Sequence, residues 1–248
     1  MKLCLLVPHY DHVAQFRRLL PSLLGTNLPL VIVDDASPAD VLGELERLIE
    51  ECGREIKLVR HEHNQGKGGA VTTGLVAALE AGFTHALQID ADGQHDVDYI
   101  DDLVSLAAQH PDAIVCGEPV FDESISKLRY YGRYLTHVLV WLETLSTEVR
   151  DAMCGFRVYP AGPVVTLIKR KPPGRRMAFD PELLVRASWA DIPIYYTPVK
   201  VRYPEDGASH FRYLRDNAII SWMHTRLVFG MLLRLPLLLW RKIRSRQP

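Results

Sequence analysis

The stretch LQIDADGQHD, Leu87 to Asp96, runs a short apolar segment directly into a group of carboxylates. Neighbouring carboxylates raise one another's pKa and destabilise a fold. A bound Mg²⁺ or Mn²⁺ would reverse that cost, because both ions take oxygen ligands. Alternate side chains of an extended chain point the same way, so Asp90, Asp92 and Gln94 can face one ion. A solvated turn is the alternative, and Asp96 is suited to cap the helix that follows.

Apolar runs of strand length alternate with helical spacing through the first half of the chain. Strands are expected at 3–7, 28–35, 56–61, 84–90 and 112–117. Helices are expected between them, at 13–24, 41–49, 66–81 and 100–108. This alternation predicts an α/β fold with a parallel, doubly wound sheet. Ligands bind beyond the carboxyl ends of the strands in such sheets, which is where the acids of the opening stretch lie.

The second half of the chain is less regular. Helices are expected at 127–145 and 179–189, and strands at 154–159 and 194–201. No linker divides the chain, so we expect one domain over residues 1–212. A separate C-terminal helical segment is expected over residues 213–248.

Composition excludes some classes of partner and site. The formal net charge of -1 does not favour a nucleic-acid partner, which normally meets a basic face. The four cysteines are scattered without CxxC spacing, so we expect neither a disulfide framework nor a zinc site. Such cysteine usage fits a reducing cytoplasm.

Two further motifs suit a nucleotide. Asp34 and Asp35 end the second expected strand, where a carboxylate could accept a hydrogen bond from a nucleobase or ribose; an Asx turn is the alternative. The string HNQGKGGA, residues 63–70, brings three glycines and Lys67 to a helix start. That arrangement suits a diphosphate or its ribose, and a plain tight turn is the alternative.

Two later strings carry charge in unusual places. In DAMCGFR, residues 151–157, Gly155 permits a close approach and Arg157 can pair with phosphate. RMAFDPELLVRA places Asp180 and Glu182 at a helix start, either as a base or as favourable charge on the helix dipole. Taken singly, each string has a sufficient structural explanation, and only their joint order favours function.

The ordered set VPHYDH, VIVDDAS, HNQGKGGA, QIDADGQHD, DAMCGFR and FDPELL resembles the family 2 glycosyltransferases of GT-A fold. It is most similar to the branch of dolichyl-phosphate mannosyltransferases and polyprenyl-phosphate glycosyltransferases, over residues 1–209. The resemblance implies a Rossmann-like, mostly parallel sheet flanked by helices, and a UDP- or GDP-sugar donor. The residues it implies for the base and ribose are Pro8, Tyr10, Asp34 or Asp35, and nearby Lys67. Those it implies for Mg²⁺ or Mn²⁺ against the donor diphosphate are Asp90, Asp92 and Gln94.

The sequence departs from the family pattern in three places. Cys154 replaces the usual serine of Ser-Gly-Phe-Arg, and the Gln-x-x-Arg-Trp signature of processive synthases is missing. The closing Ser-Lys is here Ser209 and His210, whose imidazole could contact either the metal or the diphosphate. The stretch from Ser209 to Leu227 is also similar to the glycosyltransferases of aryl-polyene and related glycolipid pathways.

The resemblance implies sugar transfer with inversion and leaves the acceptor open. A lipid phosphate is already anionic and needs cations to position it, for which Arg129, Arg133 and Arg157 are the candidates. Arg129 and Arg133 lie one turn apart, so a solvated helix face explains them equally well. A hydroxyl acceptor needs a carboxylate base instead, and Asp151 and Glu182 are the candidates.

The C-terminal segment predicts a membrane contact. Residues 227–240 are almost wholly apolar and precede four basic residues, Arg241, Lys242, Arg244 and Arg246. The run is shorter than the about 20 residues of a spanning helix, so we expect a helix lying in the interface on the cytoplasmic face. On this interpretation, truncation after Thr225 releases the protein and spares nucleotide binding. Packing of this helix on the α/β core or on a second subunit is the alternative.

Two rival functions remain. A nucleotidyltransferase would carry a glycine-rich basic loop after the first strand, where this chain has PHYDHVAQF. A non-catalytic nucleotide-sugar-binding scaffold at the membrane would be favoured by broken metal ligands, which here are intact.

Overall fold

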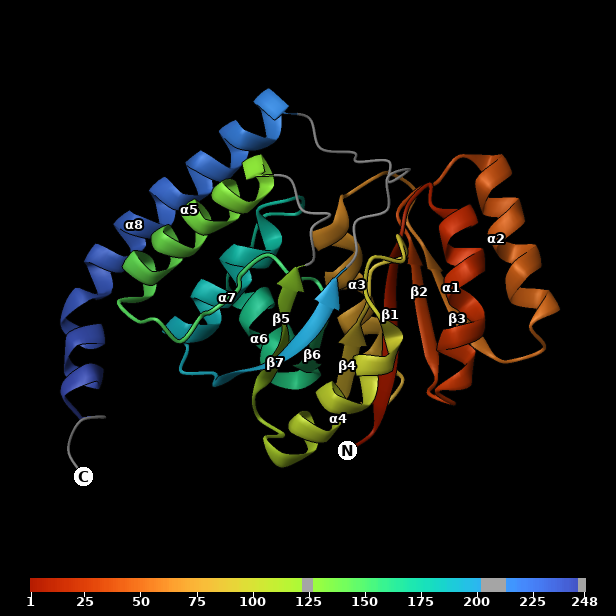
Figure 1. Cartoon of the computed structure of the whole chain (residues 1–248), viewed down its shortest axis with the longest axis horizontal. Helices are drawn as coiled ribbons and strands as arrows, with labels where there is room; N and C mark the ends of the chain where they lie inside the picture. Colours follow the sequence, from red (N-terminus) through yellow and green to blue (C-terminus); the bar gives the residue numbers. More distant parts are fainter. Residues whose placement is uncertain (122–126, 202–212, 245–248) are drawn as a thin grey trace.

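A seven-stranded sheet forms the centre of the molecule (Figure 1). The computed structural model describes residues 1–121, 127–201 and 213–244. The strands are β1 (Leu3–His9), β2 (Leu30–Asp34), β3 (Ile56–Arg60), β4 (His85–Gln88), β5 (Ile114–Phe121), β6 (Arg157–Pro160) and β7 (Ile194–Val201). Their spatial order is β3-β2-β1-β4-β6-β5-β7. The predicted α/β fold with a mostly parallel sheet is confirmed.

Strand β6 is the antiparallel strand of this mostly parallel sheet. It runs antiparallel to both of its neighbours, pairing Val158 with Leu87 of β4 and Arg157 with Cys116 of β5. The start of β6 therefore lies at the edge where the parallel strands end. Residues 151–156 precede it, so this loop reaches the same crevice as the acids after β4.

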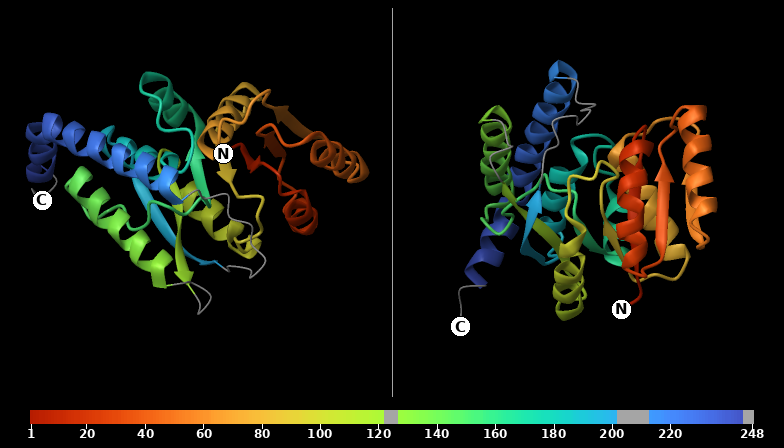
Figure 2. Two further views of the ribbon diagram at one scale, coloured as in Figure 1. Left: turned by 90° about the horizontal axis from the view of Figure 1, so that it is seen from above. Right: turned by 45° about the vertical axis from the view of Figure 1, so that its right-hand side comes forward.

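Helices cover both faces of the sheet (Figures 1 and 2). One face is packed by α1 (Val13–Gly25), α2 (Ala39–Glu51) and α4 (Ile100–Gln109). The other is packed by α3 (Lys67–Glu80), α6 (Ala161–Arg170) and α7 (Phe179–Trp189). Helix α6 was not predicted. The apolar spacing of α1 explains its orientation, because Phe16, Leu20 and Leu23 recur on one stripe and are all buried. Burial of each such side chain stabilises the folded state by about 1.5–3 kcal/mol.

Two long helices, α5 (Lys127–Thr144) and α8 (Tyr213–Arg244), lie side by side along the outside of the molecule (Figures 1 and 2). Nδ1 of His224 in α8 is 2.7 Å from Oε1 of Glu143 in α5, and both side chains are buried. Trp189 of α7 donates to the Glu143 carbonyl at 2.9 Å. These contacts join both helices to the core.

Helix α8 has features of both alternatives for the C-terminal segment, packing on the core and contact with a membrane. One face is buried in the core through Met223, Leu227, Met231 and Leu238. The opposite face exposes large apolar side chains, including Leu233, which is 84% exposed. Within the described ranges, one helix, Arg215–Arg244, is long and apolar enough to cross a membrane by length and composition. Truncation after Thr225 would strip buried side chains from the core, which corrects the expectation of a clean release.

Candidate active site

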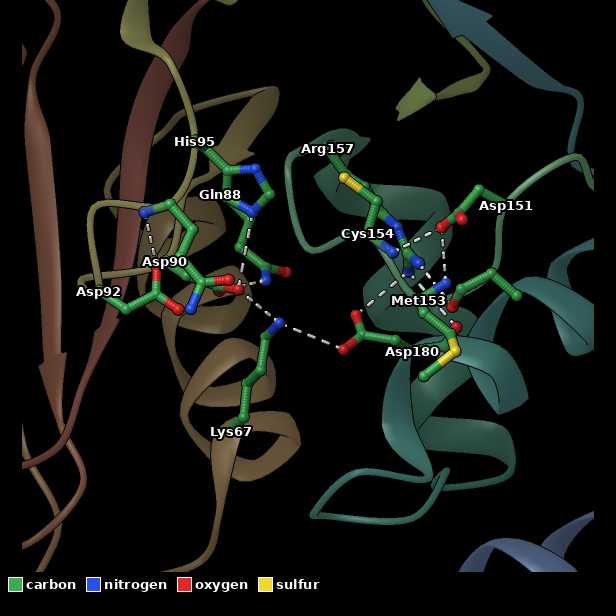
Figure 3. Close-up of polar contacts among 12 residues, drawn as sticks. Lys67, Gln88, Asp90, Asp92, His95, Asp151, Met153, Cys154, Arg157 and Asp180 are labelled. Carbon is green, nitrogen blue, oxygen red and sulfur yellow. Dashed lines mark hydrogen bonds and ion pairs between the residues drawn. The ribbon is translucent and has the colours of Figure 1, made fainter. Parts of the chain in front are cut away.

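Two of the three expected metal ligands, Asp90 and Asp92, follow β4 on either side of the buried Ala91. Ile89 and Ala91 are 0% and 2% exposed, which turns the alternate side chains, Asp90 and Asp92, outward into the crevice (Figure 3). Oδ1 of Asp90 accepts a hydrogen bond from Gln88 Nε2 at 3.1 Å. Oδ1 of Asp92 accepts from the backbone N–H two residues on, at 3.0 Å, which fixes the turn.

The electrostatics of this pair suit a divalent cation. Burial, together with the neighbouring Asp90 carboxylate, raises the pKa of Asp92 to about 6. Burial alone would also raise the pKa of Asp90, but the Lys67 ammonium holds it below its ordinary value. In the described part of the chain no three His, Cys, Asp or Glu side chains gather as a metal cage. Two carboxylates, one of which is costly to ionise without a bound cation, fit a partly hydrated Mg²⁺ or Mn²⁺. Gln94 follows them in the chain and is half-buried.

Lys67 links this pair to the other half of the crevice (Figure 3). Its Nζ lies 2.8 Å from Oδ2 of Asp90 and 3.3 Å from Oδ2 of Asp180. The expected glycine-rich helix start is confirmed, since α3 begins at Lys67 and Gly66 has a φ of 82°. A side chain at Gly66 would also meet the backbone of Arg175 at 2.8 Å, so this turn is pressed against the segment before α7.

Gly155 has the close approach predicted for it. A Cβ at this position would clash with Lys67 Nζ and would lie 2.6 Å from Asp90 Oδ2. It would also lie 2.9 Å from Gln88 Nε2. Only glycine therefore leaves room for the ion pair between the two halves of the crevice.

Arg157 lies beneath the crevice rather than in it. The side chain is 0% exposed, and its Nη2 donates to the Ala152 carbonyl at 2.9 Å. Its Nη1 is 3.2 Å from Oδ1 of Asp180. The structure therefore corrects the expectation that Arg157 meets an acceptor phosphate: the guanidinium holds the 151–156 loop and Asp180 in place.

Asp151 is fully engaged by its neighbours. Its carboxylate accepts from Arg133 Nε at 2.6 Å and Nη2 at 2.7 Å, and from the backbone N–H groups of Met153 and Cys154. Nε2 of His137 lies 3.1 Å away. Burial alone would raise the pKa of Asp151, but His137 and Arg133 hold it well below its usual range. An acid this reluctant to take a proton is a poor general base.

Glu182 also faces away from the crevice. Its carboxylate accepts from the Gly174 N–H at 2.7 Å, pairs closely with Arg186, and lies 3.5 Å from Arg226 of α8. This corrects the choice of Glu182 as a candidate base, because the acid of FDPELL that enters the crevice is Asp180. Two positions apart on a helix, the two side chains diverge by about 200°.

Asp34 is buried and internally bonded. Oδ1 lies 3.1 Å from His9 Nδ1, and Oδ2 accepts from the Ser37 N–H at 3.1 Å in the expected Asx turn. Burial alone would raise the pKa of Asp34, but His9 and Ser37 hold it below its ordinary value. Pro8 and Tyr10 flank this pair at the end of β1 and are half-buried.

Asp35 shapes the glycine-rich turn. Its carboxylate accepts from the backbone N–H groups of Gln65 at 2.8 Å and Gly66 at 2.7 Å, and lies 2.7 Å from His61 Nδ1. Both acids at the end of β2 are therefore hydrogen-bonded to the loops around the crevice. Arg129 belongs to α5, but its side chain, like the whole of His210, lies outside the described part of the chain.

His95 was not predicted as a site residue. Its ring stacks on Phe156 with centroids 5.2 Å apart, and its Nε2 is 3.9 Å from Asp90 Oδ2. Burial lowers the pKa of His95 to about 4, so the imidazole is neutral. The signal was its place inside the opening stretch, directly before the helix cap Asp96. Asp96 accepts from the Asp98 N–H, and a capped polar turn would more simply explain this segment.

Residues 4–172 match the model of glycosyl transferase family 2. The chain belongs to this family. The predicted enzyme class is thereby confirmed, and membership of a glycosyltransferase family argues against the nucleotidyltransferase alternative.

Two curated relatives of this glycosyltransferase are both named for dolichyl phosphate. A dolichyl-phosphate β-glucosyltransferase from Mus musculus is 29% identical over 184 residues, which cover 66% of this chain and 53% of the relative. A UDP-N-acetylglucosamine–dolichyl-phosphate N-acetylglucosaminyltransferase from Methanococcus voltae is 24% identical, covering 81% of this chain and 86% of the relative. The chain spans about half the length of the dolichyl-phosphate β-glucosyltransferases it matches.

Solved structures agree on the fold. Glucosyl-3-phosphoglycerate synthase from Mycobacterium tuberculosis aligns with a TM-score of 0.65 and 16% identity, covering 93% of this chain and 79% of that one. The mannosyltransferase from Pyrobaculum calidifontis in complex with GDP-Man and Mn²⁺ aligns with a TM-score of 0.59 and 17% identity, covering 94% and 64%. At these identities the likeness establishes the GT-A fold.

Proposed function

We propose that this protein moves a sugar, with inversion, from a UDP- or GDP-sugar to the phosphate of a polyprenyl-type lipid at the cytoplasmic face of a membrane. The observation that carries the proposal is the state of the crevice acids. Asp90 and Asp180 are each paired with Lys67, and Asp151 is paired with Arg133. The remaining acid, Asp92, is the expected metal ligand. A hydroxyl acceptor needs a free base, whereas a lipid phosphate is already a nucleophile.

The donor half of the crevice suits a nucleoside diphosphate. The turn between β3 and α3 ends at a helix start, where phosphates are favoured, and Lys67 adds an ammonium group. Pro8 and Tyr10 lie at the adjacent end of β1, where we place the nucleobase. The metal, when bound by Asp90, Asp92 and Gln94, supplies positive charge that stabilises the departing diphosphate. The relative from Methanococcus voltae is named for UDP-N-acetylglucosamine, and a structural neighbour was solved with GDP-Man and Mn²⁺.

The acceptor half is built around Arg133. Its guanidinium is bound to Asp151 in a two-pronged pair and lies 5.1 Å from the Phe121 ring centroid. Only 12% of the side chain is exposed, so it is held in one orientation on α5. We assign it the task of orienting the acceptor phosphate beside the 151–156 loop, whereas Arg157 supports that loop from beneath. Curated relatives named for dolichyl phosphate support this class of acceptor.

A paired apolar surface on α5 and α8 supports the membrane contact. We define this surface by its exposed side chains Tyr131, Tyr134, Leu135, Val138 and Leu142 of α5, and Trp222, Phe229, Leu233, Leu237, Trp240 and Ile243 of α8. Apolar side chains with aromatic rings among them suit the membrane interface. Arg241, Lys242 and Arg244 in the last turn of α8 suit an anionic leaflet, at about 1 kcal/mol for each basic residue near it. The free thiols of all four cysteines, each within the described ranges, accord with the cytoplasmic side.

A donor screen tests the proposal. Thermal unfolding is measured with a panel of UDP- and GDP-sugars, each with Mn²⁺ and with EDTA, because a ligand that binds only the folded state raises its apparent stability. We expect one nucleotide class to raise Tm with Mn²⁺ and to lose that effect with EDTA. Stabilisation that EDTA leaves unchanged would contradict the proposed role of the metal. No stabilisation by any sugar nucleotide would contradict the proposed donor.

A further inference from the structure

Lys67 is the one side chain that contacts acids from both halves of the crevice drawn in Figure 3. Asp90 comes from the loop after β4, and Asp180 comes from the first turn of α7. The same Asp180 pairs with the buried Arg157, whose other contact is the Ala152 carbonyl. The ammonium group of Lys67 therefore sits at the middle of a charged chain that runs from the metal ligands to the loop on the acceptor side.

The charges around Lys67 are unbalanced. Three carboxylates, Asp90, Asp92 and Asp180, face two cations, Lys67 and Arg157. Arg157 is fully buried and fixed, but the Lys67 side chain is 25% exposed on a flexible four-carbon stem. Oδ1 of Asp90 accepts from Gln88 and Oδ2 is held by Lys67, so an incoming cation has to compete with the ammonium group for this carboxylate.

We propose that Lys67 is a displaceable internal cation, which holds Asp90 in place before the donor arrives and moves from it to the donor's diphosphate when the metal–donor complex forms. This inference rests on the proposed function. Asp180 keeps the ammonium group within the crevice during the exchange, because its carboxylate is anchored by Arg157. Metal and nucleoside diphosphate then favour one another's binding. The diphosphate draws Lys67 away from Asp90, which frees this carboxylate for the metal, and the metal at Asp90 frees Lys67 for the diphosphate.

Titrations of Mn²⁺ in the absence and presence of UDP or GDP test this inference without measuring transfer. In wild type we expect weak Mn²⁺ binding alone and much tighter binding with the diphosphate. In Lys67→Met, the competing cation is gone, so Mn²⁺ alone should bind on the order of tenfold tighter. The coupling between Mn²⁺ and the diphosphate should fall several-fold, because no ammonium group then moves from Asp90 to the diphosphate.

Matched variants control for folding and for charge. Lys67→Arg keeps a cation at the site and should retain weak Mn²⁺ binding, and circular dichroism checks that each variant is folded. Lys57→Met removes a lysine from the opposite end of the sheet, where Nζ donates to the Ala77 carbonyl, and should behave as wild type. Suppose that wild type binds both Mn²⁺ and the diphosphate. If folded Lys67→Met then has the same Mn²⁺ affinity and the same coupling as wild type, this inference is wrong and the proposed function is unaffected. Wild type that binds neither Mn²⁺ nor a diphosphate would overturn it together with the proposed function.

Discussion

Oδ2 of Asp151 lies 2.6 Å from Nε of Arg133, and Oδ1 lies 2.7 Å from Nη2, so the two side chains form a parallel two-pronged pair. Arg133 belongs to α5, whose outer face is apolar, and Asp151 opens the loop that precedes β6. The pair therefore joins the surface proposed to meet the membrane to the loop proposed to meet the acceptor.

The Arg133 pair predicts that Asp151→Asn loses stability. Asp151 is 3% exposed, and breaking a buried pair costs about 3–5 kcal/mol, which lowers Tm by several degrees in a chain of this size. Calorimetry with Glu118→Gln as the control tests this, because Glu118 pairs with Arg150 at the surface and contributes about 0–1 kcal/mol. An Asp151→Asn variant with wild-type Tm and no transfer activity would identify Asp151 as a base instead.

Replacing a metal ligand should abolish metal-dependent donor binding without destabilising the fold. Asp92→Ala should leave Tm in EDTA unchanged or slightly raised, because it removes a carboxylate whose charge is disfavoured by burial. It should abolish the increase in Tm that Mn²⁺ and a sugar nucleotide give together. Asp98→Ala, an exposed acid in the same segment, is the control. Retained Mn²⁺-dependent donor binding in Asp92→Ala would exclude this residue as a ligand.

The raised pKa of Asp92 predicts how metal binding depends on pH. Because the folded carboxyl has a pKa of about 6 against an ordinary 3.8, its ionisation costs stability in the metal-free protein as pH rises through that window. Below about 6 a metal must displace the proton, so the Mn²⁺-induced rise in Tm should be small at low pH. It should grow through that pH and level off above it. A rise in Tm of equal size on both sides of pH 6 would contradict this assignment.

Gly155 predicts a steric effect on the same site. In Gly155→Ala the new methyl group would clash with Lys67 Nζ and crowd Asp90, so one of them must move. We expect Mn²⁺ affinity with UDP or GDP to fall about tenfold or more, the equivalent of about 1.4 kcal/mol. Gly162→Ala is the matched control, since nothing lies within 4 Å of a Cβ there. Equal affinity in both variants would mean that the close approach at Gly155 is unimportant.

The paired apolar surface predicts binding to anionic vesicles. Replacing Phe229, Leu233 and Leu237 by serine removes exposed apolar area from α8, so co-sedimentation with vesicles should be lost while Tm changes little. Leu227→Ser is the contrasting variant, because Leu227 is 2% exposed and its loss should lower Tm without abolishing vesicle binding. If the triple variant instead dissociates a dimer, the surface joins two copies of the chain.

The sequence predicted the sheet better than it predicted the orientation of side chains. Apolar runs located β1 to β5 and β7 within a few residues, because buried parallel strands are almost uniformly hydrophobic. The direction of β6 was not predictable, since the pattern Phe156 to Tyr159 is the same in either direction. Helix α6 was missed because its apolar spacing lies within a segment that is also rich in basic residues and proline.

The sequence identified most of the residues that lie at the candidate site, but it identified the contacts of only some of them. Asp90 and Asp92 face the same way as expected, because alternation after a buried strand is a local property of the chain. Lys67 reaches Asp90 because the ends of the parallel strands converge at one edge of the sheet. The role of Arg157 depended on tertiary packing, since an arginine is rarely fully buried and its partner Asp180 is 23 residues away. The choice between Asp180 and Glu182 likewise depended on which face of α7 meets the crevice.

Transfer of a radiolabelled sugar to lipid tests the central claim most directly. The donor that gives the largest Mn²⁺-dependent stabilisation is incubated with the full chain and vesicles containing either a polyprenyl phosphate or the matching polyprenol. Label is then measured in the organic extract. We predict that label enters the lipid only with the phosphate-bearing acceptor and Mn²⁺, and is lost with EDTA. Transfer to the polyprenol at an equal rate, or to neither lipid, would contradict the claim that the acceptor is a lipid phosphate.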